Sequence, residues 1–311
     1  MSERVIIHDV GMRDGLQIEK AVVPTDRKAA WIGQLARSGV DLLQIGSFVN
    51  PQRVPQMADT DRLFRRALAM PRRPGLAFTG LVLNEKGLER GMACGVEFFC
   101  MGVSASETHS RKNTGMSTAE AADRIIAMGR QAAAAGRRVQ VSVQSAFGCG
   151  FEGPIPLERV LAIIRRYADA GLTAVSLADT SGHGDPGQVE AMVAAVQAVD
   201  PAIDITCHFH DTYGMGLANV YAAYRAGVRT FEAGFGGLGG CPFVARAAGN
   251  VCTEDVVHMF QRFDVRTDID LEVISAVTRD AAGFFGTAMP GTIHRTGPIP
   301  HRGRFAGPAG D

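Results

Sequence analysis

The feature that most restricts the fold of this chain is a repeated alternation of short strand-like segments with longer helical ones. The strand-like segments are rich in apolar and β-branched residues and cover Val5–Val10, Asp41–Phe48, Leu76–Leu83, Val96–Val103, Arg138–Ser145, Ala174–Ala178, Ile203–His210 and Arg229–Gly234. Helical periodicity follows each of them, over Thr25–Ser38, Thr60–Ala69, Glu85–Ala93, Ser117–Ala135, Pro156–Ala170, Asp185–Val199, Leu217–Ala226 and Thr253–Phe263. Strands that alternate with helices pair in parallel. Eight such units in 311 residues predict a single closed (β/α)8 barrel, the TIM-barrel architecture, rather than an open doubly wound sheet.

The C-terminal part of the chain changes character. We expect the barrel over residues 1–265 and a helical extension over 266–286, with its helix at Asp270–Phe285. Residues 287–311 are rich in Gly and Pro and cannot build a core of their own. We expect this tail to be mobile or to lie over the barrel rather than to form a separate domain.

Composition excludes several classes of partner. Lys+Arg and Asp+Glu both number 32, so no net charge favours nucleic acid or an anionic membrane. The six cysteines contain no C-x-x-C pair, which in a chain of this size indicates reduced thiols rather than a disulfide framework. The N-terminus lacks the regions of a signal peptide, and the apolar runs are too short to span a membrane. We expect a cytoplasmic protein.

Two histidines, His208 and His210, lie two residues apart in the seventh predicted strand. Side chains two apart on a strand point to the same face, about 6–7 Å from each other. Imidazole is a common metal ligand, so the pair suits one metal ion. A pair of core or pocket histidines is an equally good interpretation of this spacing alone.

Polar residues gather after the predicted strands, where this fold places its active site. Asp14 follows the first strand, which adjoins the seventh and eighth once a barrel closes, so Asp14 is the natural third ligand. Oxygen and imidazole ligands with open positions suit Mg²⁺ or Mn²⁺, and also Co²⁺ or Zn²⁺. The alternative is that Asp14 only forms an ion pair or turn with its neighbour Arg13, whose planar guanidinium could instead clamp a carboxylate or an enolate oxygen.

A glycine-rich run, Gly236–Gly240, ends in Cys241. Such a backbone rearranges easily, as a catalytic loop requires. Near a cation the Cys241 thiol could transfer a proton or act as a nucleophile. A phosphate-binding loop or a plain turn would have the same glycine content.

Several motifs occur together in one order along the chain. They are R-D-G-L-Q at Arg13–Gln17, S-F-V at Ser47–Val49, Q-M at Gln56-Met57, L-A-D-T at Leu177–Thr180, H-F-H-D-T-Y-G at His208–Gly214, G-L-G-G-C-P at Gly237–Pro242 and G-N-V-C-T-E-D at Gly249–Asp255. In this order they resemble the 3-hydroxy-3-methylglutaryl-CoA lyase family of metal-dependent barrel lyases, which have a pyruvate carboxyltransferase-like domain. The resemblance runs from about Ile7 to Phe260.

The resemblance implies a reaction and a ligand set. It implies an oxo-acid-lyase that cleaves a 3-hydroxy-3-methylglutaryl-CoA-like thioester to acetyl-CoA and a 3-keto acid such as acetoacetate, as in leucine catabolism. It also implies a divalent cation, Mg²⁺ or Mn²⁺ by preference, bound by Asp14, His208, His210 and Asn250. By the same resemblance the protein is expected to be a homodimer.

The resemblance also assigns roles to individual residues. Arg13 would stabilise the enolate of acetyl-CoA, and Cys241 would protonate it. Asp179 or His208 would accept the hydroxyl proton, and the sequence does not choose between them. Gln17 and Lys20 match family positions near the substrate.

Three positions depart from the family pattern: Gln44 stands where a glutamate is usual, Met12 where proline is usual, and Asp9 where glutamate is expected. Gln44 keeps the hydrogen-bonding reach but removes a charge, and we count it with the substrate-binding residues. We therefore expect an intact metal site and thiol with altered substrate choice or rate.

Other functions compete with the lyase. They are a lyase for a different 3-hydroxyacyl-CoA, a Claisen-type synthase or aldolase of the same superfamily, a metal-dependent hydrolase, and a degenerate barrel that only binds. The cysteine in G-L-G-G-C-P argues against a synthase, because such relatives usually lack it. In barrel hydrolases the H-x-H pair usually lies on the first strand rather than the seventh.

Overall fold

The computed structural model describes residues 4–240 and 249–299. Its parallel strands form one closed barrel in sequence order, with β1 paired to β8. The strands are β1 (Ile6–Asp9), β2 (Leu42–Ser47), β3 (Ala77–Leu81), β4 (Phe98–Ser104), β5 (Arg138–Gln144), β6 (Ala174–Asp179), β7 (Asp204–Phe209) and β8 (Thr230–Ala233). The predicted (β/α)8 barrel is confirmed.

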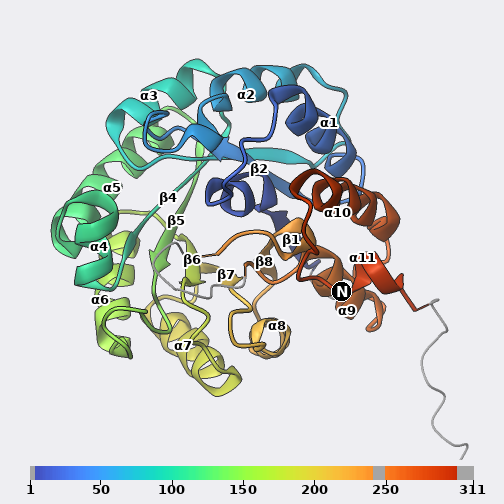
Figure 1. Cartoon of the computed structure of the whole chain (residues 1–311). Coiled ribbons are helices and arrows are strands. Elements are labelled where there is room, and N and C mark those ends of the chain that lie inside the picture. Colours follow the sequence, from blue (N-terminus) through green and yellow to red (C-terminus); the bar gives the residue numbers. More distant parts are fainter. Residues whose placement is uncertain (1–3, 241–248, 300–311) are drawn as a thin grey trace, which may run out of the picture.

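Helices surround the strands as an outer ring (Figure 1). They are α1 (Thr25–Leu35), α2 (Thr60–Ala69), α3 (Glu85–Ala93), α4 (Glu107–Thr114), α5 (Thr118–Ala134), α6 (Leu157–Asp169), α7 (Pro186–Val199), α8 (Gly216–Arg225) and α9 (Thr253–Gln261). Their apolar faces bury large side chains against the sheet, among them Trp31, Phe64 and Tyr167. The start of α5 is a capping box between Ser117 and Glu120, as the sequence indicates.

Helix α4 was not expected from the sequence. Its eight residues, E-T-H-S-R-K-N-T, have no apolar periodicity. The helix is defined by its ends instead: the side chain of Ser106 accepts the backbone N–H of His109, and Gly115 ends it with a φ of 78°.

The segment after β1 also differs from the loop that its sequence suggests. Gly11–Gly15 forms one turn of π-helix, in which the N–H of Gly15 donates to the carbonyl of Val10 at 3.4 Å and the N–H of Asp14 donates to the same carbonyl at 2.8 Å. Such turns are rare and often occur at functional sites. Two short 3₁₀ turns follow later in the chain, at Pro55–Met57 and Phe235–Gly237.

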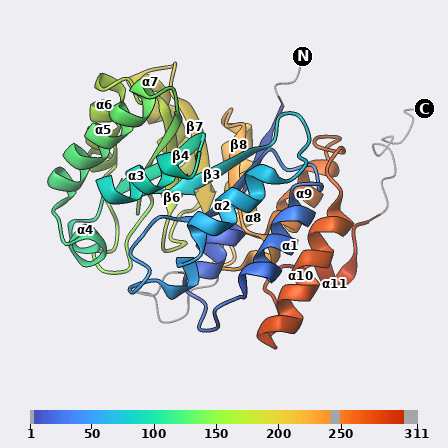
Figure 2. The same cartoon turned by 90° about the horizontal axis from the view of Figure 1, so that it is seen from above.

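The helical extension, α10 (Leu271–Phe285), lies beside α1 and α9 and covers the part of the ring where the barrel closes (Figures 1 and 2). Trp31 of α1 donates its indole N–H to Asp280 at 2.6 Å and packs edge-on against Phe284. The extension therefore adds buried surface to the seam between the first and last barrel strands.

The described part of the tail includes a short helix, α11 (Ile293–Thr296). The backbone N–H groups of Thr292 and Ile293 donate to the carboxylate of Asp255 on α9, at 3.0 and 2.9 Å. The boundaries at residues 265 and 286 stay predictions, and residues 300–311 lie outside the described structure. Within the described ranges, no helix is both long and apolar enough to cross a bilayer.

Candidate metal centre and active site

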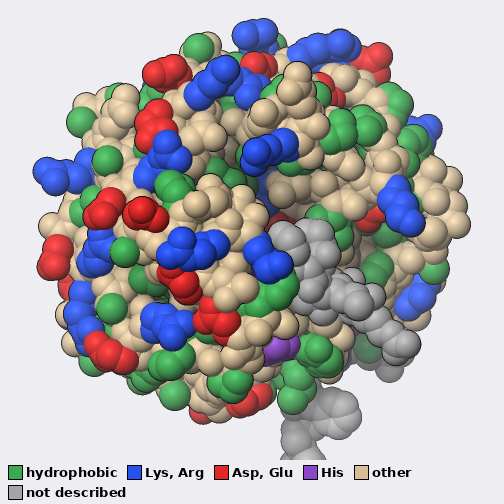
Figure 3. Space-filling model, turned by 60° about the vertical axis from the view of Figure 1, so that its left-hand side comes forward, with side chains coloured by type: hydrophobic (Ala, Val, Ile, Leu, Met, Phe, Trp, Pro, Cys, Tyr) green, Lys and Arg blue, Asp and Glu red, His purple; other side chains and the backbone are tan. Residues whose placement is uncertain are grey.

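A cavity opens at the carboxyl ends of the barrel strands, where the predicted site residues follow β1, β7 and β8. Its lining comprises Arg13, Asp14, Gln17, Ile18, Leu81, Leu83, His109, Asn113, Ser142, Gln144, Ser176, Ala178, Thr180, His208, His210, Glu232 and Gly240. The space-filling view shows a hollow with Lys and Arg side chains at its edge (Figure 3). This placement agrees with the usual position of active sites in this fold.

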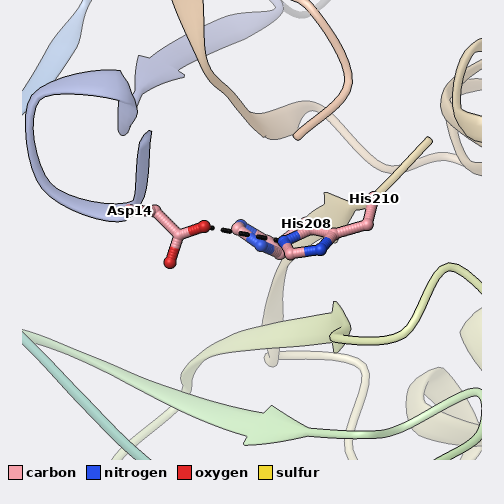
Figure 4. A group of neighbouring side chains, drawn as sticks. All are labelled: Asp14, His208 and His210. Carbon is pink, nitrogen blue, oxygen red and sulfur yellow. Dashed lines mark ion pairs between the residues drawn. The ribbon is translucent and has the colours of Figure 1, made fainter. Parts of the chain in front are cut away.

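Asp14, His208 and His210 converge on one point of this cavity (Figure 4). Each offers one possible ligand atom, and these atoms all lie within 4.8 Å of one another. Nε2 of His210 is 3.6 Å from Oδ2 of Asp14. The π-helical turn after β1 brings Asp14 to the two histidines at the end of β7.

Asn250 lies beside this group through an antiparallel bridge with His210. Its Nδ2 donates to Oδ2 of Asp14 and to the carbonyl of Leu238, both at 2.9 Å. Its Oδ1 is buried and has no hydrogen-bond partner among the described residues. A buried acceptor without a partner is costly unless a ligand satisfies it.

This donor set fits a divalent cation. It holds a carboxylate, two imidazoles and an unpartnered amide oxygen, and carboxylate and amide oxygens are ligands that Mg²⁺ and Mn²⁺ accept. Asp14 is ionised in this setting. Burial by itself would raise its pKa, but the charge of Arg13 and the two histidines outweigh that effect and hold the pKa of Asp14 well below its ordinary value.

Arg13 lies between two side chains of the site. Its Nη1 donates to Oδ1 of Asp14 and its Nε donates to Oε1 of Gln44. Gln44 is buried on β2. Its side chain contacts the guanidinium of Arg13 although it carries no charge. Gln44 and Asp14 together hold the guanidinium of Arg13 at the wall of the cavity.

The other predicted site residues do not all line the cavity. Gln17 lines the cavity with a buried Oε1 that has no partner in the described structure, whereas Lys20 is exposed and does not line it. Asp179 does not line the cavity either: its oxygens accept the backbone N–H groups of His183 and Gly184 at 2.9 and 3.0 Å. Burial raises the pKa of Asp179. Cys241 lies outside the described residues, so its role stays a prediction.

The glycine-rich segment approaches the candidate metal ligands closely. Gly239 has a φ of 117°, and a Cβ on it would lie 2.6 Å from Nδ2 of Asn250. Only glycine satisfies both conditions at this position. The turn before it is held by Glu254, whose carboxylate accepts the N–H of Gly236 at 3.0 Å.

Sequence reasoning missed Glu232, a site residue on strand β8. Glu232 lines the cavity and lies 2.9 Å from Nδ1 of His208. The signal in the sequence is a single acidic residue inside the apolar strand T-F-E-A. Such a residue is rarely buried without a partner, but its partners lie on other strands.

The fold and this donor set together define a (β/α)8-barrel enzyme with a candidate metal site. The chain belongs to the HMGL-like family, whose sequence profile matches residues 4–280. It is 36% identical to the hydroxymethylglutaryl-CoA lyase YngG of Bacillus subtilis, over 93% of this chain and 95% of that protein. It is 37% identical to the (R)-citramalyl-CoA lyase of Chloroflexus aurantiacus, over 96% of each chain.

A solved structure shares the same fold closely. It is an HMG-CoA lyase from Acinetobacter baumannii in complex with coenzyme A and 3-methylmalate, with a TM-score of 0.89, 35% identity and 97% of both chains covered. The resemblance to the 3-hydroxy-3-methylglutaryl-CoA lyase family is thus confirmed, and the chain is an enzyme of the oxo-acid-lyase class.

Proposed function

We propose that this enzyme is a divalent-metal-dependent lyase that cleaves 3-hydroxy-3-methylglutaryl-CoA, or a close analogue, to acetyl-CoA and a 3-keto acid such as acetoacetate. The observation that carries the proposal is the convergence of Arg13, Asp14, His208 and His210 in one cavity. Gln17 lines the same cavity, and its buried Oε1 has no hydrogen-bond partner among the described residues.

The metal would be Mg²⁺ or Mn²⁺, with Co²⁺ or Zn²⁺ as alternatives, held by Asp14, His208, His210 and Asn250. When bound, such a cation makes a coordinated hydroxyl easier to ionise. Asp14 contributes a full negative charge, because its pKa is held well below the ordinary value by Arg13 and the histidines despite its burial. The carboxylate and amide oxygens favour the harder ions.

Cleavage requires one proton to leave the substrate hydroxyl as the carbon–carbon bond breaks and its electron pair moves to the thioester. Asp179 or His208 would accept this proton. His208 can do so only while its Nε2 does not bind the cation, whereas the carboxylate of Asp179 accepts the backbone N–H groups of His183 and Gly184. Arg13 would donate to the enolate oxygen, which its place at the cavity wall supports. Cys241 would then protonate the enolate carbon. Gly240, the described residue before it, lines the cavity.

Citramalyl-CoA is a second candidate substrate. The citramalyl-CoA lyase relative is as similar as the HMG-CoA lyases, and the site carries Gln44 where a glutamate is usual. We infer that the acyl group is a branched 3-hydroxyacyl-CoA in either case. We also expect a cytoplasmic homodimer acting in leucine catabolism if 3-hydroxy-3-methylglutaryl-CoA is preferred.

The test is release of acetyl-CoA by the purified, Mg²⁺- or Mn²⁺-loaded enzyme from each thioester. Turnover of 3-hydroxy-3-methylglutaryl-CoA on the order of 1–1000 s⁻¹ supports the proposal and removes the idea of altered specificity. Preference for citramalyl-CoA supports the second substrate. Acetyl-CoA consumption with 2-oxo acids, without cleavage of either thioester, would overturn the proposal in favour of a synthase.

A further inference from the structure

Three ionisable side chains lie side by side in the barrel interior, one on each of β1, β8 and β7. Glu232 of β8 is the register partner of His8 on β1 and also of His208 on β7. All three are buried, and Glu232 is 6% exposed through the cavity that it lines. Because neighbours in register point to the same face of a sheet, closure of the barrel puts the carboxylate between the two imidazoles.

Both carboxylate oxygens of Glu232 have partners. Oε2 lies 2.9 Å from Nδ1 of His208. Oε1 accepts Nε2–H of Gln140 from β5 at 2.6 Å and lies 3.4 Å from Nδ1 of His8. His8 is in turn held by Thr79, whose hydroxyl is 2.8 Å from Nε2. The carboxylate is therefore held by side chains of β5 and β7, with His8 of β1 within ion-pair distance.

Few carboxylates reach this cavity. Asp14 and Glu232 are the only carboxylates among the described residues that line this cavity. Gln44, at the position where a glutamate is usual in the family, contributes none.

We propose that Glu232 is a positioning residue of the metal centre, which accepts Nδ1–H of His208 and thereby directs Nε2 of that ring at the cation. A carboxylate on one ring nitrogen fixes the tautomer and orientation of a metal-binding histidine and makes the other nitrogen a stronger donor. His210 has no such support, because its Nδ1 lacks a partner among the described residues. Glu232 thus acts on one ligand of the pair. The inference rests on the proposed metal-dependent function.

The experiment measures metal binding separately from turnover, by the free-Mn²⁺ signal in electron paramagnetic resonance. Glu232→Gln keeps the shape and an acceptor but removes the charge, so its affinity for Mn²⁺ should fall by about 10–100-fold. Glu232→Asp should lie between this variant and the wild type. Thr230→Val is the matched control, two residues earlier on the same strand and distant from His208 in register, and should bind Mn²⁺ as the wild type does.

Circular dichroism and the melting temperature show whether Glu232→Gln is folded. A folded variant whose affinity for Mn²⁺ is within about twofold of the wild type would overturn the inference. If Glu232→Gln does not fold, the inference can still be tested on the wild type through the position of the histidine ring protons. In Zn²⁺-loaded protein labelled with ¹⁵N-histidine, a coordinated ring should carry its proton on Nδ1. Two coordinated rings that both carry it on Nε2 would contradict the proposal.

The outcomes separate the two proposals. Weakened Mn²⁺ binding in Glu232→Gln, with no turnover of either thioester by the wild type, supports the positioning role and contradicts the proposed substrate. Normal turnover by the wild type, together with unchanged Mn²⁺ affinity in Glu232→Gln, supports the proposed substrate and contradicts the positioning role. A wild type that binds no Mn²⁺ contradicts both.

Discussion

Nδ2 of Asn250 lies 2.9 Å from Oδ2 of Asp14, although 236 positions of sequence separate the two residues. One follows the first barrel strand and the other lies beyond the last, so closure of the barrel alone brings them together. The contact joins the two ends of the barrel at the candidate metal centre.

Removal of a proposed ligand should abolish tight metal binding without unfolding the chain. Asp14→Asn keeps the size of the side chain but removes the charge, so we expect Mn²⁺ affinity to fall by more than about 100-fold, beyond the loss typical of residues that only support a ligand. Asn250→Ala should weaken it less, because an amide is a neutral donor. Calorimetric titration with Mn²⁺ measures both. Unchanged affinity in Asp14→Asn would show that the cation binds elsewhere.

Arg13 should matter for rate more than for substrate binding. Arg13→Met removes the donor proposed for the enolate oxygen, and kcat should fall by about 10²–10³-fold. Arg13→Lys restores charge but not the planar fork that contacts Asp14 and Gln44 together. It should therefore recover only part of the rate. Steady-state kinetics at saturating Mn²⁺ checks this, and a change in KM alone would assign Arg13 to ground-state binding.

A buried carboxyl behind the π-helical turn should make stability depend on pH. Burial raises the pKa of Asp9 to about 7, against the effect of its hydrogen bonds with Thr253 and the N–H of Gly11. The folded state then holds this proton between about pH 4 and pH 7 while the unfolded state releases it, so the free energy of unfolding falls as pH rises through that window.

The side chain of Asp9→Asn cannot ionise, and it can accept the N–H of Gly11 while donating to the hydroxyl of Thr253. Relative to the wild type, it should gain about 2 kcal/mol in stability between pH 5 and pH 8. Urea unfolding at the two pH values measures the difference. An equal pH dependence in wild type and variant would mean that Asp9 is ionised in the folded protein.

Gly239 should be irreplaceable for a local reason. Gly239→Ala places a Cβ 2.6 Å from Nδ2 of Asn250 and forces a φ of 117° on a residue with a side chain. We expect at least a tenfold loss of Mn²⁺ affinity with little change in melting temperature. The matched control is Gly283→Ala in α10, where a Cβ meets nothing within 4 Å. That change should stabilise the helix by about 1 kcal/mol and leave metal binding unaltered.

Gln44 is the position where substrate choice should respond. Gln44→Glu adds a negative charge beside the guanidinium of Arg13. We expect the ratio of kcat/KM for 3-hydroxy-3-methylglutaryl-CoA to that for citramalyl-CoA to change by at least about tenfold, or 1.4 kcal/mol in transition-state discrimination. Gln44→Leu separates charge from shape. Identical substrate profiles in all three proteins would clear this position of a role in specificity.

Local patterns in the sequence were enough for the barrel. Each strand–helix unit carries its own periodicity and stop residues, so its type can be predicted without knowing its neighbours. Helix α4 was not predicted, because its signals in the sequence are the end residues Ser106 and Gly115 and not an apolar repeat. The π-helical turn after β1 was not predicted either, because no local residue preference distinguishes such a turn from a loop.

For the site, the sequence could indicate residue types but not their partners. The H-x-H spacing placed His208 and His210 on one face, and the motifs added Asp14 and Asn250 by resemblance. Neither could show that Glu232 contacts His208, that Gln44 contacts Arg13, or that the oxygens of Asp179 bind backbone N–H groups.

The sequence by itself therefore determined the order and type of the elements, the barrel class and the residues able to bind a cation. The tertiary structure alone decided which of them meet. The physical reason is that element type depends on contacts within a few residues, whereas the site depends on the register of strands β1, β7 and β8, which exists only after the barrel has closed.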